Sequence, residues 1–323
     1  MSKPVILLTR RFPDAVEARA QRDYVTIPNP ADTPMTGREI VAAAADGGAA
    51  GILCAAGDAL DAGTIARLPE SVRIIATFSV GTDHIDLPAA AARGILVTNT
   101  PDVLSVATAE IAMLLILTAA RRGGEAERMV RAREWTGWAP TQLMGVTLEG
   151  KKLGILGMGR IGQALARMAR GFGMEIHYRN RNRLSPAEEQ GAIHHADDAG
   201  FLAGIDVLSM HIPGGAATRN WLNAERIATL RKGAIVVNTG RGTTVDDAAL
   251  CAALVSGHLR AAGLDVFAGE PNIHEGYHTT PNLVLLPHLG SATVETRDAM
   301  GFRCLDNLDA VLLRNEAPLH PAG

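Results

Sequence analysis

The stretch "KLGILGMGRIGQALARMARGFG", residues 152–173, decides the fold. An apolar run leads directly into Gly157, Gly159 and Gly162, which stand in G-x-G-x-x-G register and open a helical pattern. In this context the first glycine permits a tight turn, the second lets the backbone approach a pyrophosphate, and the third allows close packing of helix and strand. The amides of the helix N-terminus would face the anion. A plain glycine-rich turn is the alternative, but the flanking strand and helix favour a dinucleotide-binding unit.

Short apolar runs alternate with helical patterns along the rest of the chain. They begin at residues 5, 51, 74, 153, 175, 206, 234, 263 and 283. This alternation predicts doubly wound α/β folding, with parallel sheets covered by helices on both faces. The 323 residues are enough for two domains. A turn near residue 101 and a final helical pattern after residue 291 predict a discontinuous domain, 1–101 with 291–323, and a second domain, 102–290.

Composition excludes several kinds of partner. The net charge of -3 shows no basic excess, so we expect no nucleic acid. The longest apolar stretch, which starts at Ile111, is about half of a membrane span, and the N-terminal apolar run is too short for a signal peptide. The three cysteines lie far apart and indicate neither a disulfide framework nor a metal site. We expect a cytoplasmic protein that contacts no membrane.

The segment "EIHYRNRNRL", residues 175–184, carries arginines where the fold ordinarily has one acidic residue for the ribose hydroxyls. Arg179 stands at that position, and Asn180 and Arg181 follow it. A 2'-phosphate offers these side chains a compact dianion with fork-shaped hydrogen bonding. We therefore expect NADP(H) to be preferred, with NAD(H) still possible, and we assign Arg183 to the surface. A solvated basic loop is the alternative.

Three polar residues follow late apolar runs, where ligands of parallel sheets bind. Arg241 stands in "NTGRGTTVD", Glu270 in "FAGEP" and His288 in "PHLGSAT". A histidine is suited to donate the proton that a reduced carbonyl oxygen requires, and a neighbouring carboxylate raises its pKa. A guanidinium can hold a substrate carboxylate in a fork. We assign His288 as general acid, Glu270 as its partner and Arg241 as the substrate clamp. Each could instead serve a loop or a strand end.

The chain resembles the D-isomer-specific 2-hydroxyacid dehydrogenase family over nearly its whole length. The resemblance is carried by motifs in one order: "SVGTDHIDL", "GILVTNTPDV", "ATAEIAMLLIL", "LGILGMGRIGQALA", "NTGRG", "LDVFAGEP" and "PHLGSAT". It implies a flavodoxin-like substrate domain built from both chain ends, an inserted Rossmann nucleotide domain, an active-site cleft between them and a homodimer. The catalytic residues that it implies are again Arg241, Glu270 and His288.

The same resemblance implies further site residues. The backbone amides of Val80 and Gly81 would bind the substrate carboxylate, and Arg241, His288 and Trp138 would complete the substrate pocket, with Trp138 reaching a neighbouring subunit. Asp265 would lie near the nicotinamide carboxamide. The other positions that match cofactor contacts are Thr108, Arg160, Ile161, His211, Pro213 and Thr239, besides the three glycines, the 179–181 segment and His288.

Within the family, "IHYRNRNRL" and "EWTGWAP" resemble the NADPH-dependent glyoxylate and hydroxypyruvate reductases. We therefore expect reduction of small 2-keto acids to D-2-hydroxy acids. Hydroxyphenylpyruvate remains an alternative substrate because the residues around Ala55 are small, and phosphoglycerate oxidation is a further alternative. Formate oxidation is disfavoured, since formate enzymes carry Gln in place of Glu270. The same fold also serves dinucleotide-sensing corepressors, which share the catalytic residues. The preferred acid and the physiological direction stay open.

Overall fold

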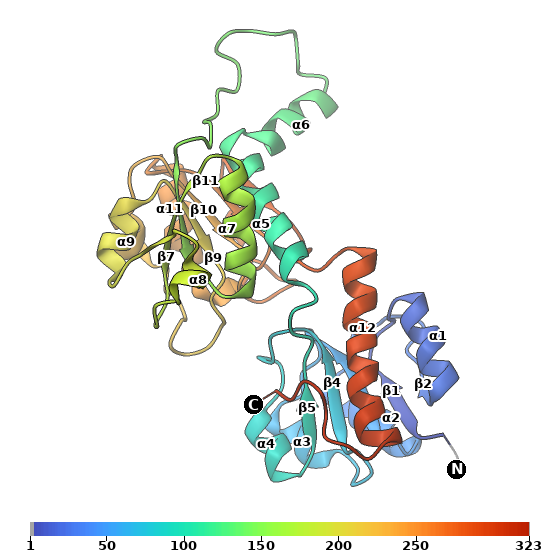
Figure 1. Ribbon diagram of the computed structural model, residues 1–323. Coiled ribbons are helices and arrows are strands. Elements are labelled where there is room, and N and C mark those ends of the chain that lie inside the picture. The colour runs from blue at the N-terminus through green and yellow to red at the C-terminus, as the bar shows by residue number, and fades with distance from the viewer. Residues whose placement is uncertain (1–2, 323) are drawn as a thin grey trace. The chain divides into compact units, whose positions relative to one another are not determined.

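A computed structural model describes residues 3–322 (Figure 1). The chain forms two compact units, Met1–Leu104 with Ala292–Gly323 and Ser105–Ser291. Each contains its own parallel sheet, which confirms the expected pair of doubly wound α/β domains. The divisions fall at Ser105 and Ser291, where the sequence suggested 102 and 290. No helix within residues 3–322 is long and apolar enough to cross a membrane.

The first unit is built on a five-stranded sheet in the order β2-β1-β3-β4-β5. Four of its strands follow one another as parallel neighbours in the manner of a flavodoxin-like sheet. The order reverses between β1 and β3, so the loops after these strands leave the sheet on either side of a switch point. The strands are β1 Val5–Leu8, β2 Val25–Ile27, β3 Gly51–Ala55, β4 Ile74–Phe78 and β5 Leu96–Thr98.

Helices cover both faces of this sheet because alternate strand residues point to opposite sides. Leu7, Ile52 and Ile75 form one core with α2, α3 and α4. Ile6 and Leu53 form another with α1 and α12. Since α12 comes from the C-terminal end of the chain, the unit is discontinuous in sequence. The helices are α1 Asp14–Asp23, α2 Gly37–Asp46, α3 Ala62–Arg67, α4 Leu87–Ala92 and α12 Val294–Leu308, which passes into a π-helical turn, Asp309–Leu313.

The second unit is built on a seven-stranded parallel sheet in the order β12-β11-β10-β9-β6-β7-β8. Its switch point lies at β6, between β9 and β7, and the glycine-rich loop follows β6 directly. The strands are β6 Lys152–Leu156, β7 Glu175–Arg179, β8 Ile193–His194, β9 Val207–Met210, β10 Ala234–Asn238, β11 Leu259–Leu264 and β12 Leu283–Leu285.

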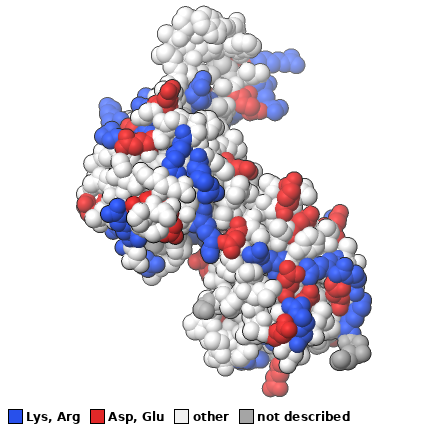
Figure 2. Space-filling model, viewed as in Figure 1, with Lys and Arg blue, Asp and Glu red and all other residues white. Residues whose placement is uncertain are grey.

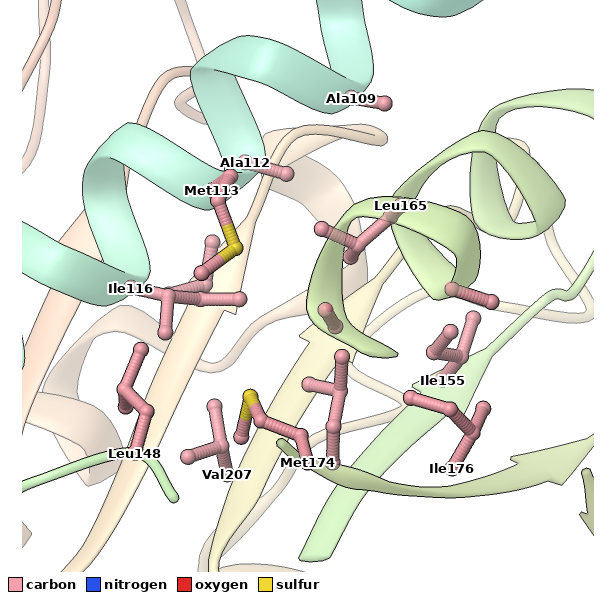
Figure 3. Packing of buried hydrophobic residues seen from close by; sticks show 14 of the residues in the cluster. Ala109, Ala112, Met113, Ile116, Leu148, Ile155, Leu165, Met174, Ile176 and Val207 are labelled. Carbon is pink, nitrogen blue, oxygen red and sulfur yellow. The ribbon is translucent and has the colours of Figure 1, made fainter. Parts of the chain in front are cut away.

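Two cores enclose the second sheet. On one face α5 packs against α7 and the strands, where Figure 3 shows Met113 and Ile116 of α5 facing Val207, with Leu165 of α7 nearby. On the other face Phe201 and Leu208 belong to a core with α9, α10 and α11. The helices are α5 Ser105–Ala120, α6 Gly123–Arg131, α7 Arg160–Gly171, α8 Pro186–Glu189, α9 Asp198–Gly204, α10 Ala224–Thr229 and α11 Asp247–Val255.

Two expected strands are placed differently in the structure. The run at 263–267 was expected to be a strand, but β11 spans Leu259–Leu264, and Asp265 beyond it accepts a hydrogen bond from the next loop through its carboxylate. The run at 283–288 was expected to end with His288, but β12 ends at Leu285. Pro287 cannot donate a ladder hydrogen bond, and His288 has a positive φ of 55°. Both site residues therefore lie in loops beyond their strands.

A segment after α5 adds little to the cores of its unit, although Val146 near its end packs against one of them. None of the nine residues of α6 in the described chain is buried. The following residues 135–147 contain no charged side chain, and Trp138 is 82% exposed. Figure 2 shows this end of the unit as an almost uncharged surface beyond the basic and acidic residues of α6. We call residues 123–147 the arm.

Candidate functional site

The phosphate loop lies between β6 and α7. Gly157 has φ of 88°, and a Cβ there would lie 3.0 Å from Ile212 Cγ2 and 3.1 Å from the His211 backbone. A Cβ at Gly162 would lie 2.8 Å from the Gly157 carbonyl oxygen, so helix and loop could not stay in contact. A Cβ at Gly159 would meet no described atom within 4 Å. Gly157 and Gly162 thus shape the turn, and Gly159 leaves the amides of α7 open to an anion.

The end of β7 is where the ribose side of the site was expected. Arg179 Nε donates to Asp198 Oδ1 at 3.0 Å, and Arg179 Nη1 donates to the Asn180 carbonyl oxygen. Asp198 also accepts from Arg226 Nη2 at 3.2 Å. Within residues 3–322 no hydrogen bond or ion pair involves the exposed Arg181 side chain. Arg179 is thus oriented by one carboxylate, whereas Arg181 is held by none of the described residues.

The neighbours of Arg179 have different partners. Asn180 Oδ1 accepts from the Met158 backbone N–H at 2.7 Å, so this side chain ties the end of β7 to the phosphate loop. Arg183, 66% exposed, donates to Glu189 at 2.7 Å, which agrees with its expected place on the surface. Asn180 therefore shapes the loop through its side chain, and the charge available at the ribose side comes from Arg179 and Arg181.

The loop that carries Arg241 is fixed by buried polar side chains. Asn238, at the end of β10, donates to the Arg241 carbonyl oxygen at 2.9 Å and accepts from the Gly240 N–H at 2.9 Å. Thr244 Oγ1 donates to the same Arg241 oxygen at 2.6 Å. With its backbone held from two sides, the loop presents the Arg241 side chain beyond the carboxyl end of the sheet.

His288 and Glu270 form a hydrogen-bonded pair. His288 Nδ1 lies 2.8 Å from Glu270 Oε2, and the His288 side chain is 47% exposed. The hydrogen bond to Glu270 raises the pKa of His288 above its ordinary value, against burial, which lowers it. Burial pushes the pKa of Glu270 upward, but the His288 bond and the Phe267 N–H leave this pKa below its ordinary value. The positive charge of Arg241 lowers the pKa of both groups.

Asp265 anchors the loop that carries His288. Its two carboxylate oxygens accept from the Leu289 N–H at 2.6 Å and the Gly290 N–H at 2.8 Å, while its carbonyl oxygen accepts from the His288 N–H at 2.9 Å. Burial raises the pKa of Asp265, although these backbone bonds oppose the rise. This buried carboxylate therefore positions the general-acid candidate, a role that its family match did not suggest.

Other expected cofactor contacts line the same unit. His211 lies between Ser209 Oγ at 2.9 Å and Thr239 Oγ1 at 3.1 Å, and burial lowers its pKa to about 4, so it is neutral at pH 7. Thr108 Oγ1 donates to the Gly290 carbonyl oxygen at 3.1 Å, which joins α5 to the His288 loop. The remaining expected contacts lie in loops or first turns after strands: Arg160 and Ile161 at the start of α7, and Pro213 after β9.

The expected carboxylate-binding amides lie in the first unit, in the loop after β4. Asn99 Nδ2 donates to the Val80 carbonyl oxygen at 2.8 Å, and Ser79 Oγ donates to the Gly81 carbonyl oxygen at 2.6 Å. Among the residues that the structure describes, neither the Val80 nor the Gly81 N–H has a hydrogen-bond acceptor. In a trans peptide an N–H points away from the C=O of the preceding residue. The Asn99 bond to the Val80 carbonyl oxygen therefore directs the Gly81 N–H away from Asn99, and the Thr100 N–H, which donates to the Ser79 carbonyl oxygen at 2.9 Å, directs the Val80 N–H in the same way.

Sequence reasoning missed the residues that orient this site. Asn238, Ser79 and Asn99 stand inside the motifs "NTGRG", "SVGTDHIDL" and "GILVTNTPDV", and a polar residue at the end of an apolar run is the signal that could have found them. No local pattern marks Asp198 or Arg226, because the ion-pair partners of each lie far away in the chain.

A phosphate-binding loop and a histidine of raised pKa follow the carboxyl ends of one parallel sheet. This combination defines the class of the protein, an NAD(P)-dependent oxidoreductase. Residues 113–290 match the model of the family "D-isomer specific 2-hydroxyacid dehydrogenase, NAD binding domain". The chain belongs to the D-isomer-specific 2-hydroxyacid dehydrogenases, and its reaction is the interconversion of 2-keto and 2-hydroxy acids.

Relatives of known name match over almost the whole chain. The glycerate dehydrogenase of Hyphomicrobium methylovorum is 45% identical, over 96% of this chain and 97% of its own. Glyoxylate/hydroxypyruvate reductase B of Cronobacter sakazakii is 40% identical, over 95% and 94%. The crystal structure of an NADPH-dependent glyoxylate/hydroxypyruvate reductase from Sinorhizobium meliloti, in complex with NADP and malonate, superposes with a TM-score of 0.88 at 37% identity, covering 100% of this chain and 97% of that one.

The residues of the second unit fit a nicotinamide dinucleotide. The open space at Gly159 leaves room for a pyrophosphate at the N-terminus of α7, which is 12 residues long. The Arg179 and Arg181 side chains lie at the end of the neighbouring strand, where the adenosine ribose belongs in this fold. When bound, the dinucleotide supplies the hydride of the reaction.

Proposed function

We propose that this protein reduces glyoxylate and hydroxypyruvate to D-2-hydroxy acids, with His288 as general acid and NADPH preferred over NADH. The observation that carries the proposal is the 2.8 Å hydrogen bond between His288 and Glu270 at the sheet edge that also bears the phosphate loop. An acid near neutral pH is what carbonyl reduction needs beside a hydride donor. The names of the relatives support the substrates.

The proposed chemistry assigns one task to each charged group. The Arg241 guanidinium binds the substrate carboxylate in a fork and draws electron density from the carbonyl oxygen. The His288 imidazolium donates its Nε2 proton to that oxygen as the carbonyl carbon accepts the hydride, so the product is a neutral alcohol. Glu270 holds the ring through Nδ1 and stabilises its charged form. In the first unit, we propose the Val80 and Gly81 amides as carboxylate-binding groups.

The proposed preference for NADPH rests on charge at the end of β7. Arg181 has no partner among the described residues, and Arg179 shares a single carboxylate with Arg226. The cluster therefore keeps a positive excess that a 2'-phosphate can satisfy and a free ribose cannot.

We also propose that the protein is a homodimer joined through the arm. The arm exposes Val130, Trp135, Trp138 and Met144, each by more than half of its surface. Grouped apolar side chains of this size mark an association surface on a folded chain. A second copy that covers the arm could receive Trp138 at its own substrate pocket. Light scattering should give twice the chain mass, and a monomer mass would refute the dimer.

The cytoplasm is the compartment that we propose. Cys54, Cys251 and Cys304 are all free, and burial holds the pKa of Cys54 and Cys304 above the ordinary thiol value. Free thiols without disulfides fit a reducing environment.

Steady-state kinetics test the proposed reaction. Glyoxylate, hydroxypyruvate, pyruvate and hydroxyphenylpyruvate are each compared with NADPH and with NADH. We expect the highest kcat/KM for glyoxylate or hydroxypyruvate with NADPH. A preference for hydroxyphenylpyruvate would instead point to the small loop at Ala55–Gly57 as an aromatic pocket. Absence of turnover with all four acids, together with tight NADPH binding, would favour a dinucleotide sensor over an enzyme.

A further inference from the structure

The ribose side of the second unit contains a carboxylate that no cofactor contact requires. Asp198, the first residue of α9, lies between two guanidiniums, with Oδ1 3.0 Å from Arg179 Nε and Oδ2 3.2 Å from Arg226 Nη2. Its side chain is 28% exposed, so solvent weakens these interactions only in part. One negative charge is thus shared by two positive charges next to the proposed 2'-phosphate position.

Arg226 is fixed independently of Asp198. Its Nη1 donates to the Trp221 carbonyl oxygen at 2.8 Å, and its guanidinium carbon lies 4.8 Å from the centre of the Trp221 ring. A guanidinium held by a carbonyl group and an aromatic face keeps its place without a carboxylate. Arg179 is different, because the described contacts of its side chain are Asp198 and the Asn180 carbonyl oxygen.

We propose that Asp198 sets how strongly the enzyme discriminates between NADPH and NADH, by acting as a counter-charge that competes with the 2'-phosphate for Arg179. This inference rests on the proposed cofactor site. A phosphate dianion that binds Arg179 must approach the Asp198 carboxylate, and this repulsion reduces what the phosphate gains. With a free ribose, Asp198 instead offsets part of the Arg179 charge, so less unpaired positive charge faces the hydroxyls.

One substitution distinguishes this counter-charge role from a role in which Asp198 only positions Arg179. In Asp198→Asn the amide oxygen can still accept from Arg179 Nε, so orientation is kept while the negative charge is removed. A counter-charge role predicts a stronger preference for the 2'-phosphate in this variant. A positioning role that depends on the charge predicts a weaker one.

Asp197→Asn provides a matched control. Asp197 is the N-cap of α9, where its Oδ1 accepts from the Gly200 N–H at 2.7 Å. Asparagine is an equally good N-cap, so this variant removes one charge one residue away and keeps the helix. The structure gives Asp197 no contact with Arg179 or Arg226 among the described side chains. We expect its cofactor preference to stay close to wild type.

Titration calorimetry with adenosine 2',5'-bisphosphate and adenosine 5'-monophosphate tests the inference without turnover. We expect the affinity ratio of the two ligands to rise about two- to tenfold in Asp198→Asn. The ratio of kcat/KM for NADPH and NADH should rise in parallel, through KM. An unchanged or lower ratio would overturn the inference.

The same measurement separates this inference from the proposed cofactor preference. If wild type favours the 2'-phosphate and Asp198→Asn does not increase that preference, only the role of Asp198 fails. If wild type does not favour it and Asp198→Asn does, the NADPH preference fails and the counter-charge role stands. If wild type does not favour it and the ratio does not rise in Asp198→Asn, both fail.

Discussion

The two ends of the cofactor unit use the same kind of contact for different purposes. At the reaction end, Glu270 lies 2.8 Å from His288. At the ribose end, Asp198 lies 3.0 Å from Arg179 and 3.2 Å from Arg226. Both are carboxylates beside cationic groups in loops or first turns after parallel strands.

The difference lies in whether the cation titrates. Imidazole gains and loses its proton near neutral pH, so Glu270 can tune that equilibrium and the pair can transfer a proton. A guanidinium stays charged at every physiological pH, so Asp198 cannot change the protonation state of Arg179. It can only change how much of the Arg179 charge remains for a ligand. A carboxylate therefore tunes chemistry at one end and selectivity at the other.

The largest effect should come from removing the titrating group. We expect His288→Ala to lower kcat for glyoxylate by about 10²- to 10⁴-fold, because the carbonyl oxygen then lacks its acid. NADPH affinity, measured by fluorescence titration, should stay within a few fold. His278→Ala, at an exposed position after β11, is the matched control and should leave kcat unchanged. Normal turnover in His288→Ala would show that His288 is not the general acid.

The next largest effect should come from replacing Arg241, whose guanidinium stays charged at the reaction end. Arg241→Ala should reduce kcat/KM for keto acids by about 10²- to 10³-fold, since both carboxylate binding and carbonyl polarisation are lost. Arg260→Ala, an exposed arginine of β11, serves as control. A loss confined to cofactor binding would contradict the role of Arg241 as substrate clamp.

A change of charge at the ribose end should alter selectivity without altering chemistry. Arg179→Asp should lower the ratio of kcat/KM for NADPH and NADH by about 10- to 100-fold, the loss of a charge-assisted hydrogen bond to phosphate. The kcat with saturating NADH should change little. Arg183→Ala, whose side chain is paired with Glu189, is the control. An unchanged ratio in Arg179→Asp would mean that the basic segment is only a solvated surface.

The smallest effect at neutral pH, within about tenfold, is expected from Glu270→Gln, and it should grow with pH. Reduction requires protonated His288, so the rate falls as pH rises through the His288 pKa. Because Glu270 raises that pKa, wild type keeps its acid protonated to higher pH. Removing the charge lowers the His288 pKa, and the descending limb of the kcat/KM profile should move to lower pH. A limb that stays in place would show that Glu270 only positions the ring.

Local patterns predicted much of this fold and site. Buried parallel strands such as β6 and β10 appear as continuous apolar runs. The short strands β2, β5 and β8 were missed, because each has only two or three residues and at least one that is exposed. The end of β11 was misplaced because Asp265, which follows an apolar run, has its hydrogen-bond partners more than twenty residues further along the chain.

The sequence alone determined the doubly wound architecture, the phosphate loop and the candidate residues Arg241, Glu270 and His288. These depend on spacing between neighbours in the chain, which periodicity and glycine positions record. Only the tertiary structure decided which partners orient them. Asp198 is 19 residues from Arg179 and 28 from Arg226, and Asp265 is 24 from Leu289. Hydrogen bonds across such separations have no sequence period, because they form only when parallel strands bring their carboxyl ends to one edge.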